Sequence, residues 1–170
     1  GEEFNGLHKP CIAQVHADVY AGGFLMIGGA THVVAVESAK FGLPEVKRGI
    51  FPFQVMATLE PLMSARQLLD LCIRAKTLSA QEAKEIGIVT DIVREEDLED
   101  TVQKLIEDIK EQSPTAIRLG LKAFQEMKSK AAEDKHKYLH AMLMQCLQSK
   151  DAAEGLLAFK EKRKANWTGN

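Results

Sequence analysis

The spacing of apolar residues changes past the middle of the chain, and this change limits the folds open to its 170 residues. Three short apolar runs in the first part have the composition and length of buried strands, and they span residues 11–16, 31–37 and 88–93. In the later part apolar residues recur at helical spacing almost to the end, interrupted at Pro114. We therefore predict a layered α/β unit over residues 1–93 and a helical region over residues 94–170.

The composition, with 45% hydrophobic residues, 27% charged residues and a net charge of −2, is typical of a soluble globular protein. It has no basic excess that would indicate nucleic acid or an acidic membrane as a partner. The three cysteines have neither metal-binding nor disulfide-framework spacing, and the first ten residues lack the pattern of a secretory signal. We expect a protein that is not secreted, with bacterial cytoplasm and mitochondrial matrix both compatible.

A turn of small residues, Ala21-Gly22-Gly23, separates the first predicted strand from a short buried helix. The first N–H groups of a helix have no partner within the helix, and glycine has no Cβ to keep a ligand away. An oxyanion could therefore bind at this turn. Taken alone, such a turn is more often structural, because glycine is the usual residue of tight turns.

Glu45 lies in a segment punctuated by glycine and proline, AKFGLPEVKRGIFP at residues 39–52. The punctuation predicts a loop with at most one short strand, and loops of this kind often hold functional residues. The apolar neighbours Phe41, Leu43 and Ile50 would give the carboxylate surroundings that suit proton transfer. A lone glutamate in a loop is more often simply solvated, so both interpretations stay open at this point.

The order of these features resembles the pattern of a known family. Residues 9–52 read KPCIAQVHADVYAGGFLMIGGATHVVAVESAKFGLPEVKRGIFP. This run is similar to the pattern of the crotonase, or enoyl-CoA hydratase/isomerase, family: KP-hydrophobic-IA-x-V, a GG turn, then A-x-FG-x-PE-hydrophobic-x-x-G-hydrophobic-x-P. The resemblance continues through LSAQEAKEIGIVTDIV and DAAEGLLAFKEKRKANW, so it extends from Lys9 to Trp167.

The resemblance implies a crotonase-like α/β fold, in which a spiral of ββα turns, partial here, precedes a helical C-terminal trimerisation region. It also implies acyl-CoA substrates, no metal or separate cofactor, and homotrimers that often pair into hexamers. The N-terminal part of the family fold, roughly the first third, has no counterpart in this sequence. Either the protein is a shortened member of the family or that part precedes Gly1, and we expect the second, because half an oxyanion hole would be a poor catalyst.

The family's catalytic groups can be matched to positions in this chain. Two backbone N–H groups hold the thioester oxygen as negative charge develops on it, which is the action of an oxyanion hole. By the resemblance, Gly22 provides the second donor, the first lies upstream of Lys9, and Glu45 moves the proton. A further set of residues is expected to contact the substrate, namely Gly23, Leu25, Phe51, Phe53 and Lys162.

Leu25 departs from the hydratase pattern. Enoyl-CoA hydratases of the family carry a second glutamate three residues after the position of Gly22, and the two glutamates hold one water. With leucine there, the chain is similar to the enoyl-CoA isomerases, which use one glutamate. Hydration and a double-bond shift both stay open, and so does a non-catalytic role as an acyl-CoA-binding or scaffold protein.

A basic tail and a pair of histidines are weaker indications of a functional site than the glycine turn and Glu45. A basic tail could contact CoA phosphates or could simply complement a helix end; it consists of Lys160, Lys162, Arg163 and Lys164. His136 and His140 have the spacing of two metal ligands on a helix, but no third ligand accompanies them, so we interpret them as part of a solvated face.

Overall fold

The computed structural model describes residues 6–170, which form two compact units. The first unit comprises residues 10–105, and the second comprises residues 6–9 and 106–170. The division falls inside helix α6 (Leu98–Lys110), whereas the sequence predicts a boundary after residue 93. Leu98 and Val102 are the buried residues of α6, and both belong to the first unit.

Three parallel strands form the first sheet, in the order β1 (Ile12–Val15), β3 (His32–Val36) and β6 (Asp91–Val93). Residues 33–36 of the central strand are buried, as expected for a strand covered on both faces. The structure confirms the strands predicted at residues 11–16 and 31–37.

The third predicted strand is shorter than expected, because β6 takes only the last three residues of the run at 88–93. Hydrogen bonds to the end of α5 account for the difference, because the N–H groups of Ile88 and Val89 both donate to the Ala83 carbonyl, at 2.9 and 3.3 Å. Thr90 bonds to Val33 through its backbone N–H and through its Oγ1. Ile88 and Val89 are buried in the core without joining the strand.

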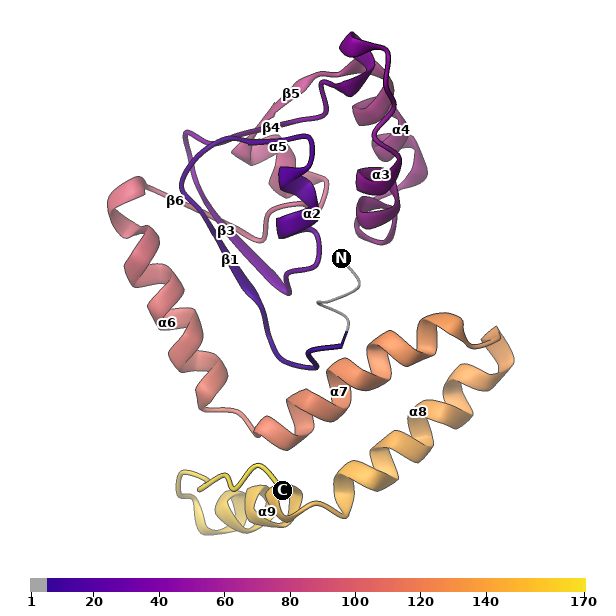
Figure 1. The fold of residues 1–170 in the computed structure, drawn as a ribbon. Helices are drawn as coiled ribbons and strands as arrows, with labels where there is room; N and C mark the ends of the chain where they lie inside the picture. The colour runs from indigo at the N-terminus through magenta and orange to yellow at the C-terminus, as the bar shows by residue number, and fades with distance from the viewer. Residues whose placement is uncertain (1–5) are drawn as a thin grey trace. The chain divides into compact units, whose positions relative to one another are not determined.

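The second sheet consists of β2 (Val19–Tyr20), β4 (Lys40–Gly42) and β5 (Thr77–Ser79), with β4 in the centre. Strand β4 is parallel to β2 and antiparallel to β5. The chain therefore passes from the first sheet to the second twice, by β1 and β2 and then by β3 and β4 (Figure 1). Helical segments follow each passage, which is the ββα order expected from the resemblance.

The helical segments of the first unit are short. They are α2 (Gly23–Ile27), η1 (Glu45–Arg48), α3 (Phe53–Leu59), η2 (Glu60–Leu62), α4 (Ala65–Arg74), α5 (Ala80–Glu85) and η3 (Glu95–Asp97). The starts of α4 and α5 are fixed by capping boxes, in which Ser64 pairs with Gln67 and Ser79 pairs with Glu82.

Large apolar side chains fill the centre of this unit, and the fully buried ones include Phe24, Phe41, Leu43, Leu59, Leu71 and Leu78. Phe24 of α2 meets Phe41 of β4 edge to face, with ring centroids 6.4 Å apart. Such a pair contributes about 0.5–1.5 kcal/mol beyond the burial of its surface. This contact holds α2 against the central strand of the second sheet.

The second unit is helical, as predicted for residues 94–170. It contains α7 (Pro114–Glu126), η4 (Met127–Ser129), α8 (Ala132–Leu147) and α9 (Lys150–Glu161), together with the end of α6. Pro114 is the first residue of α7, where its missing N–H costs nothing, and the hydroxyl of Ser113 caps the helix by accepting from the N–H of Ala116 at 3.2 Å.

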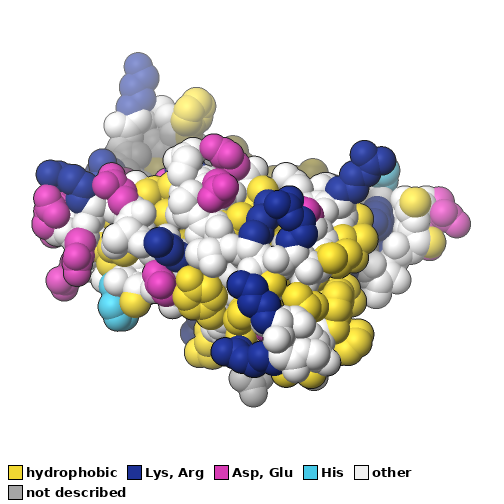
Figure 2. Space-filling view, turned by 90° about the horizontal axis from the view of Figure 1, so that it is seen from above, with side chains coloured by type: hydrophobic (Ala, Val, Ile, Leu, Met, Phe, Trp, Pro, Cys, Tyr) yellow, Lys and Arg dark blue, Asp and Glu magenta, His cyan; other side chains and the backbone are white. Residues whose placement is uncertain are grey.

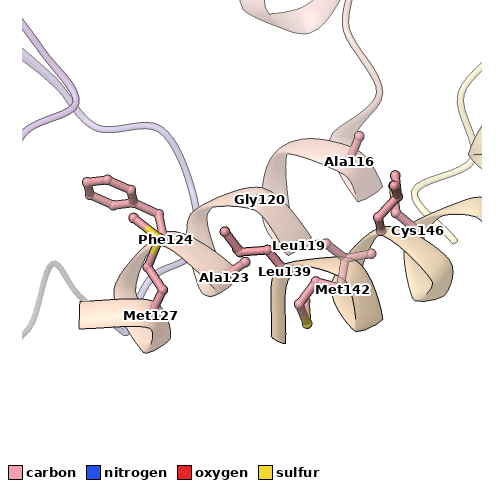
Figure 3. A pocket seen from close by; sticks show the side chains of 10 residues that line it. Ala116, Leu119, Gly120, Ala123, Phe124, Met127, Leu139, Met142 and Cys146 are labelled. Atoms are coloured by element: carbon pink, nitrogen blue, oxygen red, sulfur yellow. The ribbon is translucent and has the colours of Figure 1, made fainter. Parts of the chain in front are cut away.

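An apolar groove of about 350 Å³ runs between α7 and α8 (Figure 3). Its walls are Ala116, Leu119, Gly120, Ala123, Phe124, Met127, Leu139, Met142, Leu143 and Cys146. Phe124 and Leu143 are each more than half exposed, at 51% and 54%. An apolar surface of this kind is suited to contact another protein surface.

Acidic and basic side chains are intermixed on the face seen in Figure 2, so no single sign of charge covers it. Within residues 6–170, no helix is both long enough and apolar enough to cross a membrane.

Candidate active site

The second sheet brings the glycine turn and the Glu45 loop to one edge. Strands β2 and β4 are parallel, with Tyr20 opposite Gly42, so both end at the same edge of the sheet. The N–H of Ala21 extends the pairing by donating to the carbonyl of Gly42 at 3.1 Å. Gly22 follows directly on one strand and Glu45 shortly after the other, which makes this edge the candidate site.

Gly22 presents a free N–H in open surroundings. It precedes α2 with φ −58° and ψ −16°, a conformation that any residue adopts, and a Cβ built on it would meet nothing within 4 Å. Neither backbone strain nor internal packing therefore requires glycine here. Among residues 6–170, no acceptor takes a hydrogen bond from this N–H. The absent side chain leaves room for a ligand to approach the donor.

The turn that orients Gly22 is strained at the preceding residue, Ala21. Ala21 has φ +50°, which is uncommon for a residue with a side chain. Its carbonyl accepts from the N–H of Phe24 at 3.1 Å, and the Gly22 carbonyl accepts from the N–H of Leu25 at 3.0 Å. Since α2 has only five residues, its dipole is small, and the individual N–H group is what a ligand would meet.

The other two residues predicted on this turn pack differently. Gly23 lies against β2, because a Cβ on it would come within 3.1 Å of Cγ1 of Val19. Leu25 is half-buried on α2 and gives the helix an apolar residue where the hydratase pattern has a carboxylate. Contact of Gly23 and Leu25 with substrate stays a prediction.

Glu45 is the first residue of η1, directly after Pro44. Its loop is tied back on itself, because the N–H of Ile50 donates to the Glu45 carbonyl at 3.3 Å and Gly49, at φ +75°, ends the helical turn. The side chain is half-buried. Neither carboxylate oxygen has a hydrogen-bond partner within the described residues. Oε2 is buried, whereas Oε1 is not. Oε1 is therefore the oxygen open to a ligand.

Cys72 was not singled out from the sequence. It is fully buried on α4, the helix that packs against η1, and Glu45 is the first residue of η1. Burial raises the pKa of its thiol above the ordinary value, and the charge of Glu45 raises it further. The spacing of Leu68, Leu71 and Cys72 marks one apolar helix face, but only the folded chain brings that face to Glu45.

Phe51 and Phe53 form an aromatic pair just after the Glu45 loop. Their ring centroids are 5.2 Å apart, and Phe53, at the start of α3, is 65% exposed. Phe51 is half-buried, so the exposed ring of Phe53 provides most of the apolar surface that this pair offers to a ligand. Their predicted part in the acyl pocket remains a prediction.

The basic tail belongs to the second unit, and part of it is engaged there. Arg163 binds both carboxylate oxygens of Glu154, at 2.6 and 3.0 Å, and Lys164 pairs with Glu111 at 2.9 Å. The bonds to Glu154, together with one to Glu161, raise the pKa of Arg163. Lys162 is exposed at the end of α9 and forms no ion pair within residues 6–170. Its contact with CoA stays a prediction.

The two histidines on α8, His136 and His140, are both exposed. The described part of the chain contains no group of three or more residues able to hold a metal ion. The interpretation of a solvated face stays a prediction for these two residues.

Comparisons with known proteins agree on one family. The family model described as enoyl-CoA hydratase/isomerase matches residues 2–170. A carnitinyl-CoA dehydratase from Salmonella paratyphi A is 31% identical over 172 residues, which cover 98% of this chain and 66% of the relative. The chain thus spans 66% of the length of this curated relative.

Solved structures give the same result for the fold. The enoyl-CoA hydratase from Bacillus anthracis superimposes with a TM-score of 0.93 at 29% identity, over 99% of this chain and 66% of that one. The enoyl-CoA hydratase from Mycobacterium tuberculosis H37Rv gives a TM-score of 0.89 at 29% identity, over 96% of this chain and 65% of that one. The predicted crotonase-like fold is confirmed.

Proposed function

Because this chain belongs to the enoyl-CoA hydratase/isomerase family, we propose that it acts on an acyl-CoA thioester at the edge shared by β2 and β4. One observation carries the proposal: the register of these parallel strands directs an unpaired N–H, at Gly22, and an unpaired carboxylate, at Glu45, to the same edge. A donor for a developing oxyanion and a base for a nearby proton are the two groups that α-proton chemistry on a thioester requires.

Gly22 acts on the carbonyl. As a proton leaves the carbon next to the thioester, negative charge develops on the thioester oxygen, and the N–H of Gly22 donates to that oxygen. The interaction strengthens as the charge grows, so it favours the transition state over the substrate. An added Cβ at Gly22 would meet no atom within 4 Å, which supports the approach of a ligand to this residue.

Glu45 carries the proton. In a double-bond shift of a 3-enoyl-CoA, Oε1 takes a proton from C2 while the electron pair of the C–H bond moves into the dienolate. The same group returns the proton to C4, which leaves the double bond between C2 and C3. One carboxylate suffices, and the apolar Leu25 is compatible with this course. The shift changes no oxidation state, so it needs no redox cofactor. We also propose that no metal takes part, because Gly22 and Glu45 supply the donor and the base, and that CoA is a portion of the substrate.

Three substrates separate the possible reactions. Crotonyl-CoA tests hydration, a 3-enoyl-CoA tests the double-bond shift, and carnitinyl-CoA tests the dehydration for which the Salmonella relative is named. Spectrophotometry should detect turnover of the 3-enoyl-CoA above that of crotonyl-CoA. Absence of turnover with all three would contradict an enzymatic function.

A non-catalytic acyl-CoA-binding protein is the second candidate, and Leu25 is the observation that favours it, because a hydratase-type second carboxylate is missing. Calorimetry with CoA thioesters distinguishes it: binding without turnover of any of the three substrates supports this role.

Assembly into homotrimers or hexamers also remains a prediction from the family, for which the exposed groove of α7 and α8 offers an apolar surface.

Gly22→Ala should lower the activity of the protein without lowering its stability. The backbone conformation suits alanine and its methyl group meets no atom within 4 Å, so we expect unchanged stability or a gain of up to ~1 kcal/mol. The methyl group would occupy space in front of the donor, so kcat/KM should fall roughly tenfold, less than the 10²–10³ typical for complete loss of an oxyanion donor.

The matched control for this variant is Gly120→Ala on α7, where an added Cβ also meets nothing within 4 Å. We expect this change to leave kcat/KM unaltered. Equal activity of Gly22→Ala and Gly120→Ala in steady-state assays would argue against an oxyanion at Gly22.

A further inference from the structure

One residue of the glycine turn has a backbone conformation that its side chain disfavours. Ala21 has φ +50°, in the left-handed region, where a Cβ is crowded by a neighbouring carbonyl oxygen. Glycine adopts the same φ without this cost. A residue strained in this way persists only where the surrounding structure holds it, and such residues cluster at functional sites.

Hydrogen bonds hold both backbone polar groups of Ala21. Its N–H donates to the carbonyl of Gly42 at 3.1 Å, which attaches the turn to β4. Its carbonyl accepts from the N–H of Phe24 at 3.1 Å, which attaches the turn to α2. With a partner on either side, the two peptide groups that flank Ala21 have little freedom to rotate.

Aromatic packing fixes these two partners in turn. Phe24 is fully buried and meets Phe41 of β4 edge to face. Tyr20, the residue before Ala21, lies against Gly42, because a Cβ built on Gly42 would come within 2.9 Å of Cε1 of Tyr20. Both partners of Ala21 are therefore held at β4, the strand that ends at the candidate site.

The conformation of Ala21 sets the direction of the Gly22 N–H. The Ala21 carbonyl and the Gly22 N–H belong to one trans peptide group, in which the two bonds point in opposite directions. Because the carbonyl points toward the N–H of Phe24, the N–H of Gly22 must point away from it. Within residues 6–170 this N–H donates to no acceptor, so Ala21 directs a free donor outward from the turn.

We propose that Ala21 is a positioning residue: its left-handed conformation, held by two hydrogen bonds, aims the N–H of Gly22 at the thioester oxygen. This inference rests on the proposed function of Gly22 as an oxyanion donor. A donor that is fixed before the substrate arrives costs no reorganisation during the reaction. The methyl group of Ala21 has no part in this role, so activity should depend on whether a substituted residue accepts a left-handed φ.

Ala21→Val tests the role, because a β-branched side chain strongly disfavours positive φ. The peptide group after residue 21 should then rotate, and the Gly22 donor should no longer face the thioester. We expect kcat to fall roughly 10–100-fold, towards the loss typical for removal of an oxyanion donor, with KM changed less than about threefold. Ala21→Gly, which accepts φ +50°, should keep kcat within about threefold of the unmodified protein and a melting temperature at least as high.

The matched control is Ala75→Val, because Ala75 at the end of α4 has nearly the same φ, +48°, outside the proposed site. It should also lower the melting temperature, yet leave kcat of the folded protein unchanged. If Ala21→Gly lost as much kcat as Ala21→Val, the methyl group and not the backbone conformation would matter, and the proposal would be overturned. Unchanged kcat in Ala21→Val, or a loss confined to KM, would overturn it as well.

Infrared spectroscopy of a bound thioester provides a readout that does not need turnover. The probe is butyryl-CoA, isotope-labelled at the thioester carbonyl, which has no double bond to hydrate or shift. A donor aimed at the carbonyl oxygen polarises the C=O bond, so binding should lower the C=O stretching frequency in the unmodified protein and in Ala21→Gly, and lower it less in Ala21→Val. If Ala21→Val does not fold, Ala21→Leu, with a bulky but unbranched Cβ, takes its place.

The infrared result also separates this inference from the proposed function. If the unmodified protein turns over no thioester but the C=O bands follow the expected order, the enzymatic function fails while the role of Ala21 stands. Equal C=O frequencies of the probe bound to the unmodified protein and to Ala21→Val would refute the role of Ala21, even in a protein that turns over thioesters.

Discussion

Replacing Glu45 by glutamine should lower turnover of the preferred CoA thioester by roughly 10²–10⁴-fold, the range for loss of a general acid–base group. Glutamine has nearly the same shape, but its amide cannot take up a proton. Because the free N–H of Gly22 is untouched, binding of the thioester should persist. Single-turnover kinetics together with calorimetry would measure both quantities.

The companion variant is Glu60→Gln, which changes an exposed glutamate of η2 in the same unit. It should retain the activity of the unmodified protein and the same thermal unfolding profile. If Glu45→Gln kept more than about a tenth of the activity under the same conditions, proton transfer would have to be assigned to another residue. If it lost binding as well as turnover, Glu45 would be a structural or binding residue instead.

Local sequence signals predicted much of the fold. The run at residues 31–37 is rich in β-branched residues, and such a signal needs only neighbours in the chain to be recognised. Pro114 marks the start of α7 because proline is favoured in the first turn. The strand is shorter than the run at 88–93 because the N–H groups of Ile88 and Val89 donate to the Ala83 carbonyl of α5, and the apolar pattern of the run does not indicate these bonds.

The candidate site was predictable only in part. β2 has two residues, too few for any periodicity, so its pairing with β4 could not be predicted from spacing. Gly22 and Glu45 could therefore be joined only through the family resemblance. Cys72 escaped notice because its helix face predicts burial, not contact with a particular loop. Asp151 also gave no signal, since an acid in the first turn of a helix is ordinarily a surface residue.

Asp151 should nevertheless dominate the stability of the helical unit. It is 1% exposed, and its two oxygens accept from different segments. Oδ1 accepts from the N–H groups of Thr168 and Gly169, at 2.8 and 3.1 Å, and Oδ2 accepts from the Ser113 hydroxyl at 3.1 Å and the Thr115 N–H at 3.3 Å. The carboxylate thereby joins the tail of the chain to the start of α7.

Asp151→Asn should lower the free energy of unfolding of this unit by about 3 kcal/mol at neutral pH. Asparagine has one acceptor oxygen, so its NH₂ group must face donors on one side and leave them unpaired. Trp167, the only tryptophan of the chain, lies in this tail and donates from Nε1 to the Glu111 carbonyl at 2.8 Å. Its fluorescence in urea titrations reports the unfolding. The exposed Asp134→Asn on α8 should change stability far less.

The effect of Asp151→Asn should also depend on pH, with a sign fixed by the carboxylate. Burial alone would raise the pKa of Asp151, but hydrogen bonds from Thr168, Thr115 and Ser113 outweigh it and hold the pKa well below the ordinary 3.8. A group with a depressed pKa stabilises the fold above its unfolded value and loses that contribution as the pH falls through the folded value. The difference between the two proteins should therefore be constant from neutral pH down to about 4 and shrink below it. A difference that widened on acidification would mean that Asp151 is protonated in the native state, and its hydrogen bonds would have to be reassigned.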